Sequence, residues 1–167
     1  MTNRPDRPPA RHWGAAVLVL ALVGVLAGCG PAATRTDDAD VLGSVSDHLE
    51  DASSAVASAE LAVRGSAAGR LPAVTADVVV GDAAETATGA VHGIGTVVLS
   101  TADAEKVRGD ALDAASDAVG PVAAARTWLG RPSSSADDVL RALDDAATAL
   151  DEASGAVRHV QWARTAP

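Results

Sequence analysis

One residue with reactive side-chain chemistry stands in an unusual place, because Cys29 directly follows a long apolar run. A cysteine thiolate can act as a nucleophile, ligate a metal or accept a modifying group. The sequence has no second cysteine, so a disulfide within the chain is excluded. The residues before Cys29 must therefore indicate which role its thiol has.

Residues 1–28 have the features of a bacterial secretory signal. Three arginines against one aspartate make the first part positive, and the stretch from Gly14 to Val25 contains only Gly, Ala, Val and Leu. The next four residues, Leu26-Ala27-Gly28-Cys29, resemble the lipobox of bacterial lipoproteins. In that pattern a small residue, here Gly28, directly precedes the cleaved bond, and an apolar residue, here Leu26, is the third residue before it.

The resemblance implies cleavage between Gly28 and Cys29 and a diacylglyceryl group on the Cys29 thiol. The lipid would hold the mature protein on the extracytoplasmic face of the bacterial cell membrane. An uncleaved membrane anchor fits less well, because Gly14 to Gly28 would span only about 22 Å as a helix, against ~30 Å of hydrocarbon core. Cys29 is therefore predicted to be a lipid attachment point.

Three histidines after the signal segment are the next candidates for chemistry: His48, His92 and His159. Each lies beside or opposite the apolar stripe of its helical segment, so the three are expected on different outer faces. The Glu-x-x-His spacing of di-iron bundles and the His-Glu-x-x-His zinc motif are both absent. We expect solvated surface histidines, no metal site and no cofactor.

Nucleophilic catalysis has no support in the sequence. A lipidated Cys29 leaves no free thiol, and the sequence contains neither a Gly-x-Ser-x-Gly elbow nor a Ser-x-x-Lys motif. The protein is therefore predicted not to be an enzyme.

The charge balance argues against nucleic acid as a partner. The formal charge of −9 becomes −11 without residues 1–28, which carry three arginines and one aspartate. An acidic domain of this kind repels phosphate backbones.

Acidic residues also recur seven positions apart near the end of the chain, on what would be one outer helix face that could attract cations or a basic partner. They are Asp137, Asp144 and Asp151, and Asp138, Asp145 and Glu152.

Four amphipathic segments must position these residues. After a short tether at 29–36, apolar residues repeat with 3-4 spacing in a bundle region, 37–164, which precedes a tail at 165–167. The predicted helices are about 37–65, 71–99, 101–130 and 135–163. Their apolar stripes are Leu42, Val45, Leu49, Ala52, Val56, Ala59 and Val63; Ala84, Ala87, Val91, Ile94 and Val98; Ala104, Val107, Ala111, Ala114, Ala118, Pro121, Ala125 and Trp128; and Val139, Leu143, Ala146, Leu150, Ala153, Val157 and Val160.

The second segment is ambiguous, because its valine-rich stretches are strand-like and four glycines weaken a helix. The 3-4 spacing nevertheless persists and no turn dipeptide interrupts it, so we predict a helix. Gly89 and Gly93 would allow a neighbouring helix to approach closely. Ser100–Asp103 and Ser135–Asp138 are predicted to be capping boxes that begin the third and fourth helices.

Similar helix lengths and short connections predict an all-α fold, an up-down-up-down four-helix bundle preceded by a signal-peptide helix. The whole resembles small Ala-rich four-helix lipoproteins of GC-rich bacteria. The lipobox and the stretch Arg70 to Ala83, which is similar to the start of their second helix, carry this resemblance. It implies no catalytic residues.

Arg158, Trp162 and Arg164 form a basic, aromatic cluster at the end of the fourth segment. In an up-down bundle this end lies beside the tether, so the cluster is a candidate membrane-facing surface. The alternative is ordinary capping of the helix by arginine, with Trp162 packed on the bundle end.

Together these features predict a non-enzymatic cell-envelope lipoprotein that contacts an envelope protein of unknown identity through its helical surface. The alternative is a carrier of a small ligand or cation, with a site between the helices. A core without Phe or Tyr argues against the carrier, because ligand pockets usually have aromatic lining.

Overall fold

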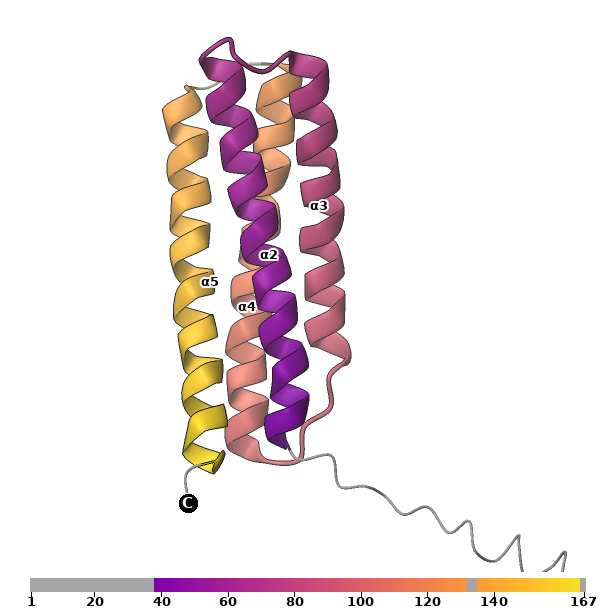
Figure 1. The fold of residues 1–167 in the computed structure, drawn as a ribbon, viewed down its shortest axis with the longest axis vertical. Coiled ribbons are helices and arrows are strands. Elements are labelled where there is room, and N and C mark those ends of the chain that lie inside the picture. Colours follow the sequence, from indigo (N-terminus) through magenta and orange to yellow (C-terminus); the bar gives the residue numbers. More distant parts are fainter. Residues whose placement is uncertain (1–37, 132–134, 166–167) are drawn as a thin grey trace, which may run out of the picture. The chain divides into compact units, whose positions relative to one another are not determined.

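The computed structural model describes residues 38–131 and 135–165, with side chains as far as Ala163. Residues 1–28, the lipobox with Cys29 and the tether lie outside this part of the chain, as does the side chain of Arg164. The described residues form four α-helices and no strand (Figure 1). The helices are α2 (Asp38–Ala67), α3 (Ala73–Thr96), α4 (Ala102–Gly130) and α5 (Ala136–Thr165).

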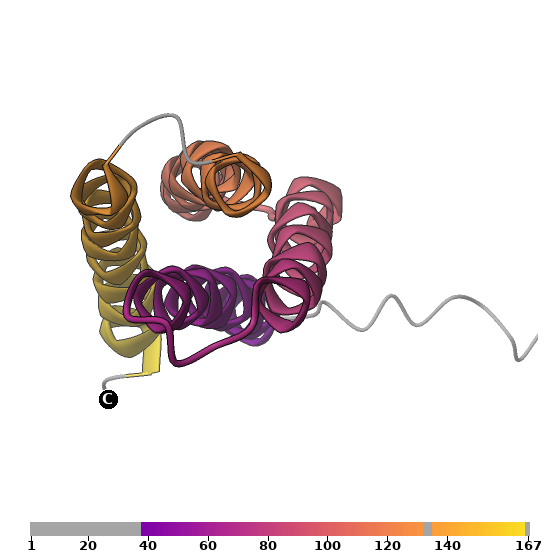
Figure 2. The same ribbon diagram turned by 90° about the horizontal axis from the view of Figure 1, so that it is seen from above.

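Consecutive helices run in opposite directions and lie around one shared core (Figures 1 and 2). The helix α2 packs against α3 and α5 on its two sides and also against α4 across the bundle, whereas α3 and α5 do not contact each other. The predicted all-α bundle of four helices is confirmed for this part of the chain. The helices α2 and α4 each contact the other three, so this diagonal pair forms the centre of the bundle.

Small side chains explain the contact between α2 and α4. The buried residues of α4 are five alanines and one valine, whereas those of α2 include two leucines and three valines. Interaxial distance falls as the side chains at a helix contact become smaller, so the alanine face of α4 lets α2 approach. The larger side chains of α2 and α5, among them Leu42, Leu49, Leu143 and Leu150, are fully buried between the helices.

The predicted stripes of the first and fourth segments are confirmed, except that Val160 is only half-buried. Those of the second and third segments are partly wrong. The helix α3 buries Ala83 and Ala90 in place of Ala84 and Val91, and α4 buries Ala115 and Val122 in place of Ala114 and Pro121. At the adjacent alanines 83–84 and 114–115, hydrophobicity does not distinguish the core residue from its neighbour. Ala84, Val91 and Ala114 are half-buried and still pack against the core.

The helix bounds differ from the predicted ones by up to three residues. The ambiguous second segment is one helix, which ends at Thr96 rather than Leu99 because Val97 has an extended backbone. Val98 was predicted as a core residue and is instead 82% exposed. The connection from α2 to α3 turns at Gly69, whose φ of +66° favours glycine.

The bundle has two distinct ends (Figure 1). The start of α2, the Val97–Thr101 segment between α3 and α4, and the end of α5 lie together at one end, which we call the entry end. The other, which we call the far end, holds the α2–α3 connection and the last turn of α4. The chain from the predicted lipobox reaches the bundle at the entry end, because α2 begins there.

Candidate functional site: the entry end of the bundle

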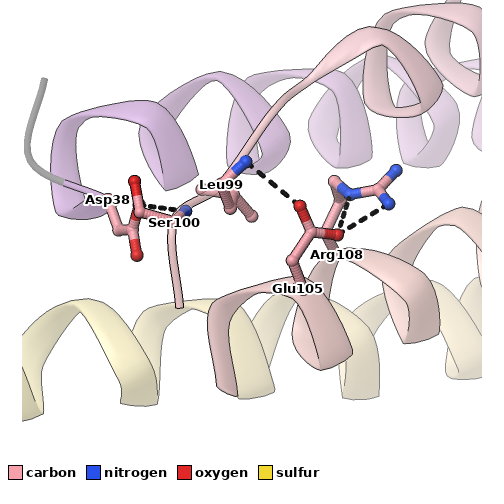
Figure 3. Close-up of polar contacts among 5 residues, drawn as sticks. All are labelled: Asp38, Leu99, Ser100, Glu105 and Arg108. Atoms are coloured by element: carbon pink, nitrogen blue, oxygen red, sulfur yellow. Dashed lines mark hydrogen bonds and ion pairs between the residues drawn. The ribbon is translucent and has the colours of Figure 1, made fainter. Parts of the chain in front are cut away.

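Asp38 is the one buried charged residue among the described residues, with 5% of its surface exposed. Its Oδ1 accepts a hydrogen bond from the Ser100 backbone N–H at 2.8 Å, and its Oδ2 accepts one from the Thr101 hydroxyl at 2.7 Å. Figure 3 shows the carboxyl group of Asp38 beside the backbone of the α3–α4 segment. This contact joins the first residue of α2 to the residues that begin α4.

The position of Asp38 suits a negative charge. Asp38 is the first residue of α2 and binds Thr101, the N-cap residue of α4, so its carboxylate lies at the start of two helices. Helix N-termini carry a partial positive charge and unpaired N–H groups, which favour an anion. Because a buried carboxylate is costly unless it is hydrogen-bonded, these two bonds make its burial tolerable.

Glu105 of α4 also binds the backbone of the segment between α3 and α4. Its Oε1 accepts a hydrogen bond from the Leu99 N–H at 3.1 Å, and its Oε2 accepts two from the Arg108 guanidinium at 2.8 and 3.1 Å. Arg108 first, and then the Leu99 N–H, hold the pKa of Glu105 below its ordinary value. At pH values above the ordinary carboxyl pKa, the lowered pKa of Glu105 stabilises the folded state. This stabilisation is lost as the pH falls through the lowered pKa.

The two predicted capping boxes have different outcomes. At the start of α4 the N-cap residue is Thr101 rather than Ser100, and its side chain makes no capping hydrogen bond, so the predicted box at Ser100–Asp103 is wrong. The Thr101 hydroxyl is oriented toward Asp38 instead. At the start of α5, the Ser135 hydroxyl accepts from the Asp138 N–H at 3.1 Å and donates to Asp138 Oδ2 at 2.8 Å, which confirms the second box.

Arg158 and Trp162 lie one turn apart on α5 and share two open surface hollows. One, of about 510 Å³, lies between the helices and is lined by Ala39, Asp40, Arg158, Gln161 and Trp162. The other, of about 630 Å³, lies along α5 and is lined by Gly155, Arg158, His159, Trp162 and Ala163. Trp162 is 64% exposed. Arg158 is exposed too.

Val98 is a second exposed apolar side chain at the entry end. It lies in the extended segment between α3 and α4, directly before Leu99, whose side chain is buried. The hydrogen bonds of the Leu99 and Ser100 amides fix the backbone next to Val98. The sequence predicted neither the exposure of Val98 nor the pairing of Asp38 with the α3–α4 segment, because both depend on where α3 ends and on which segments meet there.

The three histidines do not come together as a site. His92 and His159 are exposed, as expected. His48 is half-buried, and its ring packs over Gly93 of α3, where a methyl group would overlap it. Gly93 thus permits a close approach, whereas the space beside Gly89 is open. In the described ranges, no three His, Cys, Asp or Glu side chains are grouped so that they could hold a metal ion.

The six acidic residues of the seven-residue repeats on α5 are all exposed, as the heptad phase predicted. One of them, Asp151, lines an open polar groove of about 310 Å³ between α2 and α5. The groove also contains Glu50 and Arg158, three serines and an alanine. The acidic face of α5 is therefore accessible to solvent along its length.

Comparison of the chain with protein-family models, curated proteins and solved structures finds no match. Across the helices described here, none combines the length and apolarity that a membrane span requires.

Replacing Asp38 tests the contact that organises the entry end. We expect Asp38→Ala to lower the free energy of unfolding by about 1–3 kcal/mol, because the Ser100 N–H and the Thr101 hydroxyl lose a charged partner. Chemical denaturation measures this loss. Asp40→Ala is the matched control, since Asp40 is exposed in the same first turn of α2. It should cost less than ~1 kcal/mol, the usual limit for a helix-dipole effect at the surface. Equal losses in the two variants would contradict this role of Asp38.

Proposed function

We propose that this protein is a lipid-anchored protein of the bacterial cell envelope that works as a non-enzymatic interaction module. The observation that carries the proposal is the Leu26-Ala27-Gly28-Cys29 sequence at the end of a secretory-type apolar run. In this proposal residues 1–28 are a signal peptide, and Cys29 carries a diacylglyceryl group that holds the protein at the membrane.

The proposed anchor is compatible with the described domain. Cys29 precedes Asp38 by nine residues, a length that reaches at most about 30 Å when extended. The bundle would therefore remain close to the bilayer, with the entry end nearest the lipid. The four helices would supply the surface that a partner contacts.

The acidic face of α5 supports an interaction role. Its six exposed carboxylates form two lines along the helix, and Arg141 neutralises one of them through a 3.1 Å ion pair with Asp138. Such a surface attracts a basic partner and repels nucleic acid. We propose that the partner is an envelope protein with a complementary basic surface.

A carrier of a small ligand or cation is the alternative function. The observation in its favour is the groove between α2 and α5, in which Glu50 and Asp151 supply carboxylates. The groove is open to solvent and lacks aromatic lining, whereas small-molecule pockets are usually concave and largely apolar. Native mass spectrometry of protein purified from membranes distinguishes the two functions, since a carrier would retain a small ligand.

Removing the Cys29 thiol tests the anchor. In a lipoprotein-competent bacterium, wild-type protein should be found in the membrane fraction with a mass that shows cleavage before Cys29 and an added diacylglyceryl group. Cys29→Ala should lose that modification because it has no thiol to accept the lipid. Ser44→Ala, at an exposed position of α2, is the control and should retain it. An unmodified wild-type Cys29 would refute the anchor.

Site-specific crosslinking in the intact envelope tests the interaction module. A photoreactive residue at Asp144, on the acidic face of α5, should give a discrete crosslinked product. The same residue at Thr88, an exposed position of α3, is the matched control and should not give that product. Asp137→Asn with Asp151→Asn should weaken the Asp144 product, because both replacements remove charge from that face. An Asp144 product unaffected by these replacements would exclude charge recognition, and equal products at Thr88 would exclude a defined surface.

A further inference from the structure

We propose that the entry end is a membrane-contacting surface, in which the side chains of Val98 and Trp162 enter the headgroup region of the bilayer. The inference rests on the lipid anchor proposed above and specifies how the anchored bundle meets the membrane. Its first observation is that both side chains are large, apolar and exposed, Val98 by 82% and Trp162 by 64%.

The two side chains belong to different parts of the same end. Val98 follows the end of α3, and Trp162 lies in the last turn of α5. Because α3 and α5 occupy opposite positions in the bundle and do not contact each other, the two residues mark separated points on the end surface. Two separated points of attachment favour an upright bundle whose long axis is steep to the membrane plane.

The residues beside them suit a lipid headgroup. Tryptophan favours the boundary between water and hydrocarbon, where its ring is apolar and its N–H can find a polar partner. Arg158 lines both hollows next to Trp162 and can donate to a lipid phosphate. Asp40 lines one of these hollows as well, so net positive charge does not drive the contact. The exposed apolar side chains and the tether drive the contact with the membrane.

Exposure alone does not select this end, because Leu61 of α2 and Val74 and Val78 of α3 are exposed toward the far end. The entry end is favoured because the predicted lipid site is connected to the bundle there. The predicted lipid site precedes Asp38 by nine residues, and Asp38 is fixed to the segment that carries Val98. The bonds from Leu99 and Ser100 hold this segment in place, so little ordering is needed on contact.

Fluorescence quenching by brominated lipids tests the contact. The full-length gene product is purified from bacterial membranes and reconstituted in vesicles of phosphatidylcholine and phosphatidylglycerol, with and without bromine on the upper acyl chains. Trp13→Phe with Trp128→Phe leaves Trp162 as the single tryptophan. Brominated lipid should remove most of its emission. Trp13→Phe with Trp162→Phe isolates Trp128, near the far end, whose emission should be unchanged.

Two valine variants provide the matched pair. Val98→Asp should sharply reduce the quenching of Trp162, because it places a charge in the contact surface. Val74→Asp, at an equally exposed valine of the far half, should leave the quenching at its original level. An unquenched Trp162, equal quenching of Trp162 and Trp128, or equal effects of the two valine variants would each overturn the proposal.

The anchor and the contact have separate readouts. The mass of the same purified protein reports whether Cys29 is lipidated. An unmodified Cys29 with a quenched Trp162 would refute the diacylglyceryl anchor and retain the contact. A lipidated Cys29 with an unquenched Trp162 would refute the contact and retain the anchor.

Discussion

The hydrogen bonds of the buried Asp38 carboxyl group are the constraint on which the entry end depends. They join the first residue of α2 to Ser100 and Thr101, residues more than sixty positions later, and so connect the start of two helices. Breaking them would leave a buried acidic group without its partners and release the segment that carries Val98. The orientation of the end surface therefore depends on these bonds together with the one from the Leu99 N–H to Glu105.

The rest of the bundle depends on small side chains. Without Phe or Tyr, the core consists mainly of alanine, valine and leucine, and α4 contributes alanine at five of its six buried positions. This allows α2 to pack against α4 across the bundle as well as against its two neighbours. Because the core is closely packed, candidate functional surfaces lie on the outside of the bundle. They are the acidic face of α5, which is charged, and the entry end, which exposes apolar side chains.

Much of the fold could be predicted from the sequence, because a 3-4 apolar repeat is a local property. The stripe from Leu42 to Val63 was correct at every position, whereas the prediction failed at Ala84 and Ala114, each of which has an equally apolar alanine beside it. Arg158 and Trp162 could be recognised as a cluster, since they are one helical turn apart. Val98 and Asp38 could not, because the end of α3 and the pairing of Asp38 with the α3–α4 segment depend on the assembled bundle.

The entry end is a surface held in one conformation by the hydrogen bonds of its connecting segment. Hydrogen exchange of the Leu99 and Ser100 amides, followed by NMR on the micelle-bound protein, reports on these bonds. Neither residue is in a helix, yet their amides donate to Glu105 and Asp38. A hydrogen bond to a charged group is worth about 2 kcal/mol, so both amides should exchange roughly 30-fold more slowly than in an unstructured chain. Exchange of both amides at the unstructured rate would contradict the account.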